Sequence, residues 1–221
     1  KLNQSINANL DREKKFLLFN LKPKQKIIII KIKKDQSSLE NEKIGAEFYN
    51  FVKQNSLFNF TLLENNILET NIKNKFFLEE FLHGAQLKSY VFEKYKTKKN
   101  KQEISIFVTG KNKPSIKDQI KFKAIEDGTF YTRDLVSEPG NILHPDEYAK
   151  RINSLKKYGL KINIYDEKKL KKLGMNTLLG VGQGSIRGSY LVTMEWNGLK
   201  DKSKPLAFVG KGVCFDTGGI S

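Results

Sequence analysis

The sequence predicts an α/β fold, arranged as one large or two small domains. Short runs of apolar, often β-branched residues alternate with longer stretches in which apolar residues recur at helical spacing. The length of 221 residues exceeds the commonest size of a single domain. The hydrophobic share of 38% is modest but sufficient to form cores.

The first hundred residues are typical of a small α/β domain. Residues 39–54 and 75–86 each carry an apolar helical stripe with charged residues opposite, so we expect a helix in both. In residues 39–54 the stripe consists of Ile44, Phe48, Phe51 and Val52. Strands are expected over residues 14–21, 26–32, 60–63 and 104–108. We interpret the aromatic side chains here as core rather than as a platform for a ligand.

The character of the chain changes after Gly110. Pro114 opens a segment that ends at Pro139 and Gly140, and this pattern predicts a long helix. The apolar residues that share one face of this helix are Ile116, Ile120, Ala124, Tyr131 and Leu135.

The remaining residues again alternate between helix and strand patterns. Pro145, Asp146 and Glu147 suit the first turn of a helix that would end at Gly159, and Gly174 would stop a second helix. These helices are expected over residues 145–158 and 167–173, and strands over residues 160–165, 190–196 and 206–209. Such alternation implies a mostly parallel sheet with helices on both faces.

Composition limits the classes of function. A net charge of +16 permits binding to nucleic acid, yet only four of the 40 basic residues are arginine and the lysines are scattered. We therefore interpret the charge mainly as solvated surface. The longest apolar run, residues 27–30, is far too short to span a membrane, and no signal peptide is recognised. One cysteine suits a reducing compartment, so we expect a cytoplasmic protein.

The last residues carry the most chemical information. Lys211 and Asp216 lie five positions apart in a glycine-rich loop that directly follows the apolar residues 206–210. The two oxygens of Asp216 could bridge two divalent cations about 3.5–4 Å apart, and a lysine amine can ligate a metal in its neutral form. The alternative interpretation is an ordinary Lys–Asp ion pair on a surface loop.

This loop resembles the metal-binding signature of the leucyl (cytosol) aminopeptidase family, V-G-K-G-x-x-F-D-S/T-G-G-x-S. Residues 209–221 read V-G-K-G-V-C-F-D-T-G-G-I-S and fit it throughout. Residues 133–145 are similar to the family pattern R-D-L-V-N-x-P-x-N-x-x-x-P, and residues 173–185 to L-G-M-G-x-L-L-x-V-G-x-G-S. Residues 87–96 also look like the end of the family's N-terminal domain.

The resemblance implies a fold and its domain limits. These are a small macro-like α/β domain over residues 1–112, a linker helix over residues 113–138, and the first part of a mixed-sheet α/β metallopeptidase domain over residues 139–221. Family members are usually hexamers, so the resemblance also implies a homohexamer.

The resemblance further implies a chemistry. Lys211 would bind one of two divalent ions, Mn²⁺ or Zn²⁺, and Asp216 would bind both. The substrate would be a peptide with a free N-terminus, from which a water made acidic by the ions would release the first residue. The family's catalytic lysine and arginine and three further carboxylate ligands would lie beyond Ser221. We therefore assign no catalytic residue here and expect these 221 residues alone to be inactive.

Other interpretations stay open. The chain could be a nucleic-acid-binding or regulatory protein whose metal loop is vestigial. Cys214 lies inside the loop but lacks an obvious partner, so we interpret it as a packed residue rather than a nucleophile. His144 precedes Pro145 and is expected to cap a helix. The glycines of residues 180–185 follow a helix rather than a strand, which excludes the dinucleotide-binding pattern, so no cofactor-binding residue is assigned.

Overall fold

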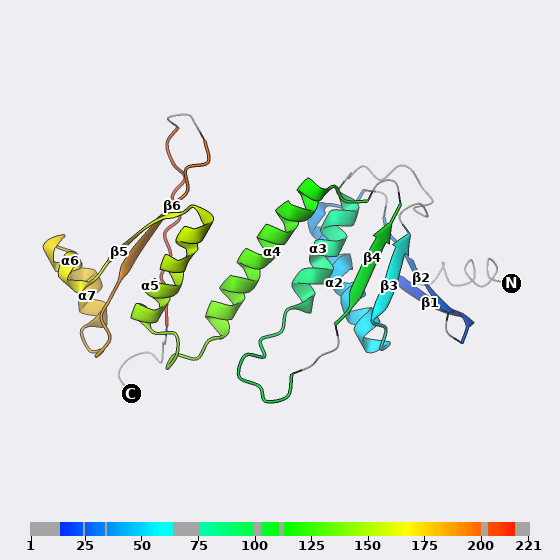
Figure 1. Ribbon diagram of the computed structural model, residues 1–221, viewed down its shortest axis with the longest axis horizontal. Helices are drawn as coiled ribbons and strands as arrows, with labels where there is room; N and C mark the ends of the chain where they lie inside the picture. Colours follow the sequence, from blue (N-terminus) through cyan, green and yellow to red (C-terminus); the bar gives the residue numbers. More distant parts are fainter. Residues whose placement is uncertain are drawn as a thin grey trace. The chain divides into compact units, whose positions relative to one another are not determined.

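The computed structural model describes residues 14–23, 25–33, 35–63, 76–99, 103–110, 113–199 and 203–214 (Figure 1). The chain divides into two compact units, Lys1–Asp134 and Leu135–Ser221. The expected α/β fold class is confirmed, because helices and strands alternate in both units. The domain limits implied by the resemblance stay a prediction. No helix in the described part of the chain has the length and hydropathy needed to cross a bilayer.

Four strands of the first unit form two pairs. Strand β1 (Phe16–Lys22) pairs antiparallel with β2 (Gln25–Ile30), in the register Phe16↔Ile30, and Pro23 lies in the turn between them. Strand β3 (Asn59–Leu63) pairs parallel with β4 (Ser105–Thr109). All four strands lie where the sequence predicted them, within two or three residues.

Two helices supply the core of the first unit. Helix α2 (Ser38–Gln54) begins at a capping box in which the Ser37 hydroxyl accepts from the Glu40 backbone N–H and the Glu40 carboxylate accepts from the Ser37 N–H. Helix α3 is Phe77–Ser89. The buried core is formed by Ile44, Phe48, Val52 and Phe81. The rings of Phe48 and Phe81 lie 5.3 Å apart, so the prediction that these aromatics form a core is confirmed.

Helices α2 and α3 approach so closely that two glycines touch the backbone of the other helix. A Cβ atom on Gly45 would lie 1.9 Å from the Phe81 carbonyl oxygen, and one on Gly84 would lie 1.9 Å from the Glu42 carbonyl oxygen. Such distances are impossible for real atoms, so the packing of the two helices requires hydrogen at both positions.

Helix α4 (Ile116–Ser137) is the long helix that the sequence predicted, but it buries a different face. Ile116 and Ile120, on the predicted apolar face, are 77% and 66% exposed. Instead Glu126 is buried, and its carboxylate lies 3.0 Å from Nδ1 of the buried His83 on α3. The Tyr90 hydroxyl also donates to Asp134. Polar groups that end up buried need partners, and this requirement outweighed the apolar pattern.

The second unit contains short helices around one strand pair. Helix α5 (Pro145–Asn153) continues as the 3₁₀-helix η2 (Ser154–Tyr158) and ends at Gly159, whose φ of 89° suits glycine. Strand β5 is Lys161–Tyr165 and strand β6 is Leu191–Glu195. Helices α6 (Glu167–Lys172) and α7 (Asn176–Gly182) lie between these strands in the sequence.

Two expectations for this unit are wrong in the described residues. Strands β5 and β6 pair antiparallel, with Tyr165 opposite Leu191. The segment that connects them contains α6 and α7, and it brings the chain back to the same end of the strand pair at which it left. Residues 206–209 form no strand, and Phe208 and Val209 are 89% and 100% exposed. A strand requires a neighbouring backbone, and none of the described residues pairs with this segment.

The contact between α2 and α3 generates a stability prediction. We expect Gly84→Ala to destabilise the 221-residue chain by about 1–3 kcal/mol, because the added methyl group must push the Glu42 backbone away. The matched control is Gly128→Ala on α4, where a Cβ meets nothing within 4 Å. Alanine favours helix over glycine by about 1 kcal/mol, so the control should keep or gain stability. Urea denaturation measures both, and equal stability of the two variants would contradict the packing argument.

Candidate metal-binding loop

Lys211 lies in an exposed stretch at the end of the described chain. Residues 203–213 are all exposed, and no hydrogen bond or ion pair joins the Lys211 amine to any residue that the structure describes. Asp216, the other predicted metal ligand, lies outside the described residues, as do Gly218 and Gly219. The pairing of Lys211 with Asp216 at a metal therefore stays a prediction.

The backbone of the loop contacts the first turn of α5, which we call the α5 turn and define as residues 144–148. A Cβ on Gly212 would lie only 2.6 Å from Cε1 of Tyr148, so the glycine backbone rests directly against that ring. Pro145 stands at the start of the helix, where its missing N–H costs no hydrogen bond. The Tyr148 backbone N–H donates to the His144 carbonyl oxygen.

Asp146 connects the α5 turn to a second segment. One carboxylate oxygen accepts from Nδ1 of His144, and the other accepts from Nη1 of Arg187 at 3.1 Å. Burial by itself raises the pKa of Asp146, but the His144 hydrogen bond and the Arg187 charge outweigh it, so the pKa is lowered. His144 occupies the N-cap position, although its side chain makes no capping hydrogen bond and binds Asp146 instead.

A buried carboxylate anchors α5 to the segment before it. The Glu138 side chain is only 2% exposed, and it accepts from Nη1 of Arg151 at 2.9 Å. Nε of Arg151 donates to Glu147 at 3.0 Å, so one guanidinium joins two carboxylates. The hydrogen bond to Glu138 is the main reason that the pKa of Arg151 is raised. Sequence reasoning assigned no role to Glu138 or Arg151, because they are thirteen positions apart and only the fold joins them.

Cys214 follows Gly212 in the loop and is half-buried. Burial raises the pKa of its thiol, and the negative charge of Asp146 raises it further. A thiol that holds its proton more tightly is a poor nucleophile, which supports interpreting Cys214 as a packed residue. Among the described residues, no group of three or more His, Cys, Asp and Glu side chains is placed to hold a metal ion.

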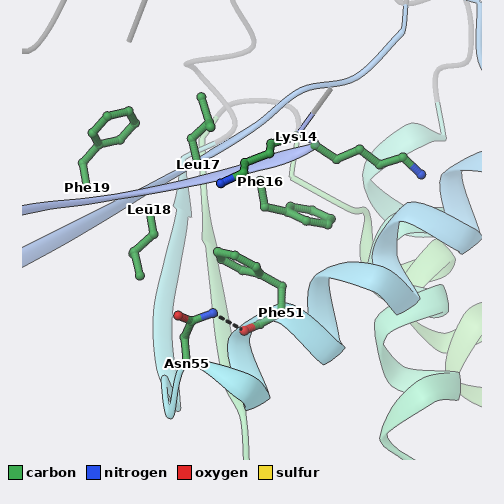
Figure 2. Close-up of a pocket in the computed structure, with 8 residues that line it drawn as sticks. Lys14, Phe16, Leu17, Leu18, Phe19, Phe51 and Asn55 are labelled. Atoms are coloured by element: carbon green, nitrogen blue, oxygen red, sulfur yellow. Dashed lines mark hydrogen bonds between the residues drawn. The ribbon is translucent and has the colours of Figure 1, made fainter. Parts of the chain in front are cut away.

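A cavity of about 490 Å³ lies elsewhere, in the first unit (Figure 2). It is lined by β1 and by the end of α2, through residues Lys14, Lys15, Phe16, Leu17, Leu18, Phe19, Phe51 and Asn55. The Asn55 amide donates to the Phe51 carbonyl oxygen at 2.8 Å, and the Lys15 amine pairs with Glu47. Among the described residues that line it there is no carboxylate, imidazole or thiol, and the charged groups of the lining are Lys14 and Lys15.

The sequence is similar to known proteins in its second part. Residues 130–221 match the sequence pattern of the cytosol aminopeptidase family, catalytic domain. The probable cytosol aminopeptidases of Brucella anthropi and Caulobacter vibrioides are each 50% identical to this chain over 147 residues. Each match covers 62% of this chain and 29% of the relative. The chain thus spans less than a third of the length of these curated relatives.

Solved structures agree in fold. A mutant of tomato leucine aminopeptidase superposes with a TM-score of 0.70 at 19% identity, covering 87% of this chain and 40% of the other. The bottromycin maturation enzyme BotP in complex with Mn gives a TM-score of 0.60 at 21% identity, covering 73% and 34%. At such identities the likeness concerns the fold alone.

The buried carboxylate yields one prediction. Glu138→Gln should lower the free energy of unfolding by about 1–3 kcal/mol, because Arg151 then keeps only the more exposed Glu147 as an ionised partner. Glu147→Gln is the matched control, since Glu147 binds the same guanidinium from a more exposed position. Its effect on urea denaturation should be the smaller of the two. A larger loss of stability in Glu147→Gln would show that burial of the carboxylate does not decide how much each ion pair contributes to the free energy of unfolding.

The lowered pKa of Asp146 yields a second prediction. Because its folded pKa lies below the ordinary 3.8, the stabilisation from this carboxylate is complete above pH 3.8 and is lost as the pH falls through the folded value. Asp146→Asn removes the titrating group. The difference in unfolding free energy between wild type and Asp146→Asn should therefore shrink below pH 3.8, and a difference that grows with acidity would contradict this linkage.

Proposed function

We propose that this chain is part of a cytosol aminopeptidase, a two-metal enzyme that as a whole protein releases N-terminal amino acids from peptides. The observation that carries the proposal is the pattern of residues 209–221, which fits the family's metal-binding loop at every specified position. The 50% identity to probable cytosol aminopeptidases supports it. We also propose that the protein is located in the cytosol, as the names of these relatives state.

Two side chains of this chain would hold the metal. Lys211 is exposed, and its amine would bind a metal once it has lost its proton. Asp216 would supply the carboxylate whose two oxygens contact both ions. When bound, Mn²⁺ or Zn²⁺ would polarise the scissile carbonyl and acidify a water. The neighbouring Gly210 and Gly212 leave the loop backbone without side chains that would crowd these ligands.

The substrate and the assembly follow from the same proposal. A peptide with a free α-amino group would be the substrate, and the protein would be a homohexamer. The catalytic side chains would belong to the part of the whole protein outside residues 1–221, which alone would be inactive. A nucleic-acid-binding or regulatory protein with a vestigial loop is not favoured, because the relatives are named as aminopeptidases.

The proposal predicts the effect of removing either ligand. In the full-length protein, Lys211→Ala and Asp216→Ala should each lower kcat/KM for an aminoacyl p-nitroanilide on the order of a hundredfold or more, because a metal loses a direct ligand. Lys204→Ala, which removes an exposed lysine from the same segment, is the matched control and should keep full activity.

The same assay tests the metal and the specificity. A chelator should abolish hydrolysis, added Mn²⁺ or Zn²⁺ should restore it, and an N-acetylated substrate should resist cleavage. Full activity in both ligand variants, or turnover that no chelator affects, would defeat the proposed function.

A further inference from the structure

The contact between Gly212 and Tyr148 is unusually close for a residue in an exposed loop. A Cβ at Gly212 would lie 2.6 Å from Cε1, 3.1 Å from Cδ1 and 3.6 Å from Cζ of the Tyr148 ring. A Cβ on Gly210, two positions earlier, would meet nothing within 4 Å. Gly212, and not Gly210, is therefore a point at which the loop contacts α5, and it is adjacent in sequence to Lys211.

The α5 turn that provides this contact is held in place from two directions. Arg187 and His144 both bind Asp146, and Glu138 binds Arg151 on the same helix. Tyr148 is itself half-buried, and its backbone N–H is held by the His144 carbonyl oxygen. The ring is therefore attached to a turn that side-chain contacts hold on both sides, while the loop against it has exposed side chains.

We propose that Tyr148 is a positioning residue. Its ring would fix how closely the loop backbone at Gly212 approaches α5, and would thereby place the Lys211 amine for the metal. This inference rests on the proposed function. The Cβ of any side chain at position 212 would lie about 0.8 Å closer to Cε1 of Tyr148 than the 3.4 Å at which ordinary van der Waals contact begins. Metal ligands tolerate errors of only about 0.2 Å in bond length, so such a shift one residue from Lys211 is large.

The alternative is that the Tyr148 ring simply turns aside when a methyl group is added. A double-mutant cycle separates the two cases, because removing the ring restores space without restoring glycine. The single variants are Gly212→Ala and Tyr148→Ala, and the double variant carries both changes. Gly180→Ala in α7 is the matched control, since a Cβ there also meets nothing within 4 Å.

The experiment uses the full-length protein and Mn²⁺ as the probe. Electron paramagnetic resonance of free Mn²⁺ measures affinity and stoichiometry, and thermal melting shows that each variant folds. Gly212→Ala should weaken Mn²⁺ binding on the order of tenfold to a hundredfold and lower kcat with little change in KM. The double variant should bind Mn²⁺ more tightly than Gly212→Ala and about as well as Tyr148→Ala, which should bind several-fold more weakly than wild type.

Three results would overturn the inference. These are wild-type Mn²⁺ affinity in a folded Gly212→Ala variant, a double variant as weak as Gly212→Ala, or wild-type affinity in Tyr148→Ala. The last result counts even if Gly212→Ala does not fold. Failure of the proposed function is distinct, because then the wild-type protein itself would bind no Mn²⁺ and release no amino acid.

Discussion

The absence of a side chain at a few glycines is the constraint on which both units depend. In the first unit, Gly45 and Gly84 let α2 and α3 approach until carbonyl oxygens occupy the space of a Cβ. In the second unit, Gly212 lets the loop rest on the ring of Tyr148. At Gly45 and Gly84 the close neighbours are backbone atoms, which cannot turn aside as a side chain can, whereas at Gly212 the neighbour is the Tyr148 ring. Close contact of this kind defines position more sharply than apolar burial alone does.

Buried polar pairs are the second feature that fixes how segments pack against each other. Glu126 binds His83 in the first unit, and Glu138 binds Arg151 in the second. Each pair joins two separate segments, and losing one member would remove a charged partner from a buried carboxylate, imidazole or guanidinium. Such pairs contribute little net free energy compared with apolar surface, but they exclude alternative packings. In α4 the pair lies on the face of the helix that is buried.

The candidate metal-binding loop combines a rigid support with an exposed donor. The support is α5, anchored through Glu138, Arg151 and Asp146, and the donor is Lys211 on a stretch of exposed residues. An anchored helix beside an exposed donor suits a site in which the ligand atoms must be precisely placed although the loop that carries them buries few side chains. Burial raises the pKa of the half-buried Cys214 thiol in the same loop, which supports its interpretation as a packed residue.

Local pattern was enough to predict much of this protein. The helical stripe of Ile44, Phe48 and Val52 and the alternating strands are encoded within a few residues, because helix and strand periods are local properties. The resemblance of the loop around Lys211 and Asp216 to the aminopeptidase signature is likewise a local property of the sequence. Helix α7 was missed because Gly180 and Gly182 are poor helix formers, so its sequence carries no clear helical pattern.

The sequence by itself determined most of the elements, the α/β class, and the types of donor that the loop carries. Only the tertiary structure decided the face that α4 buries, the antiparallel pairing of β5 with β6, and the contact between Gly212 and Tyr148. Each of these depends on atoms that lie far away in the sequence but close in space. A local pattern contains no information about which distant backbone or charged group will occupy the neighbouring position.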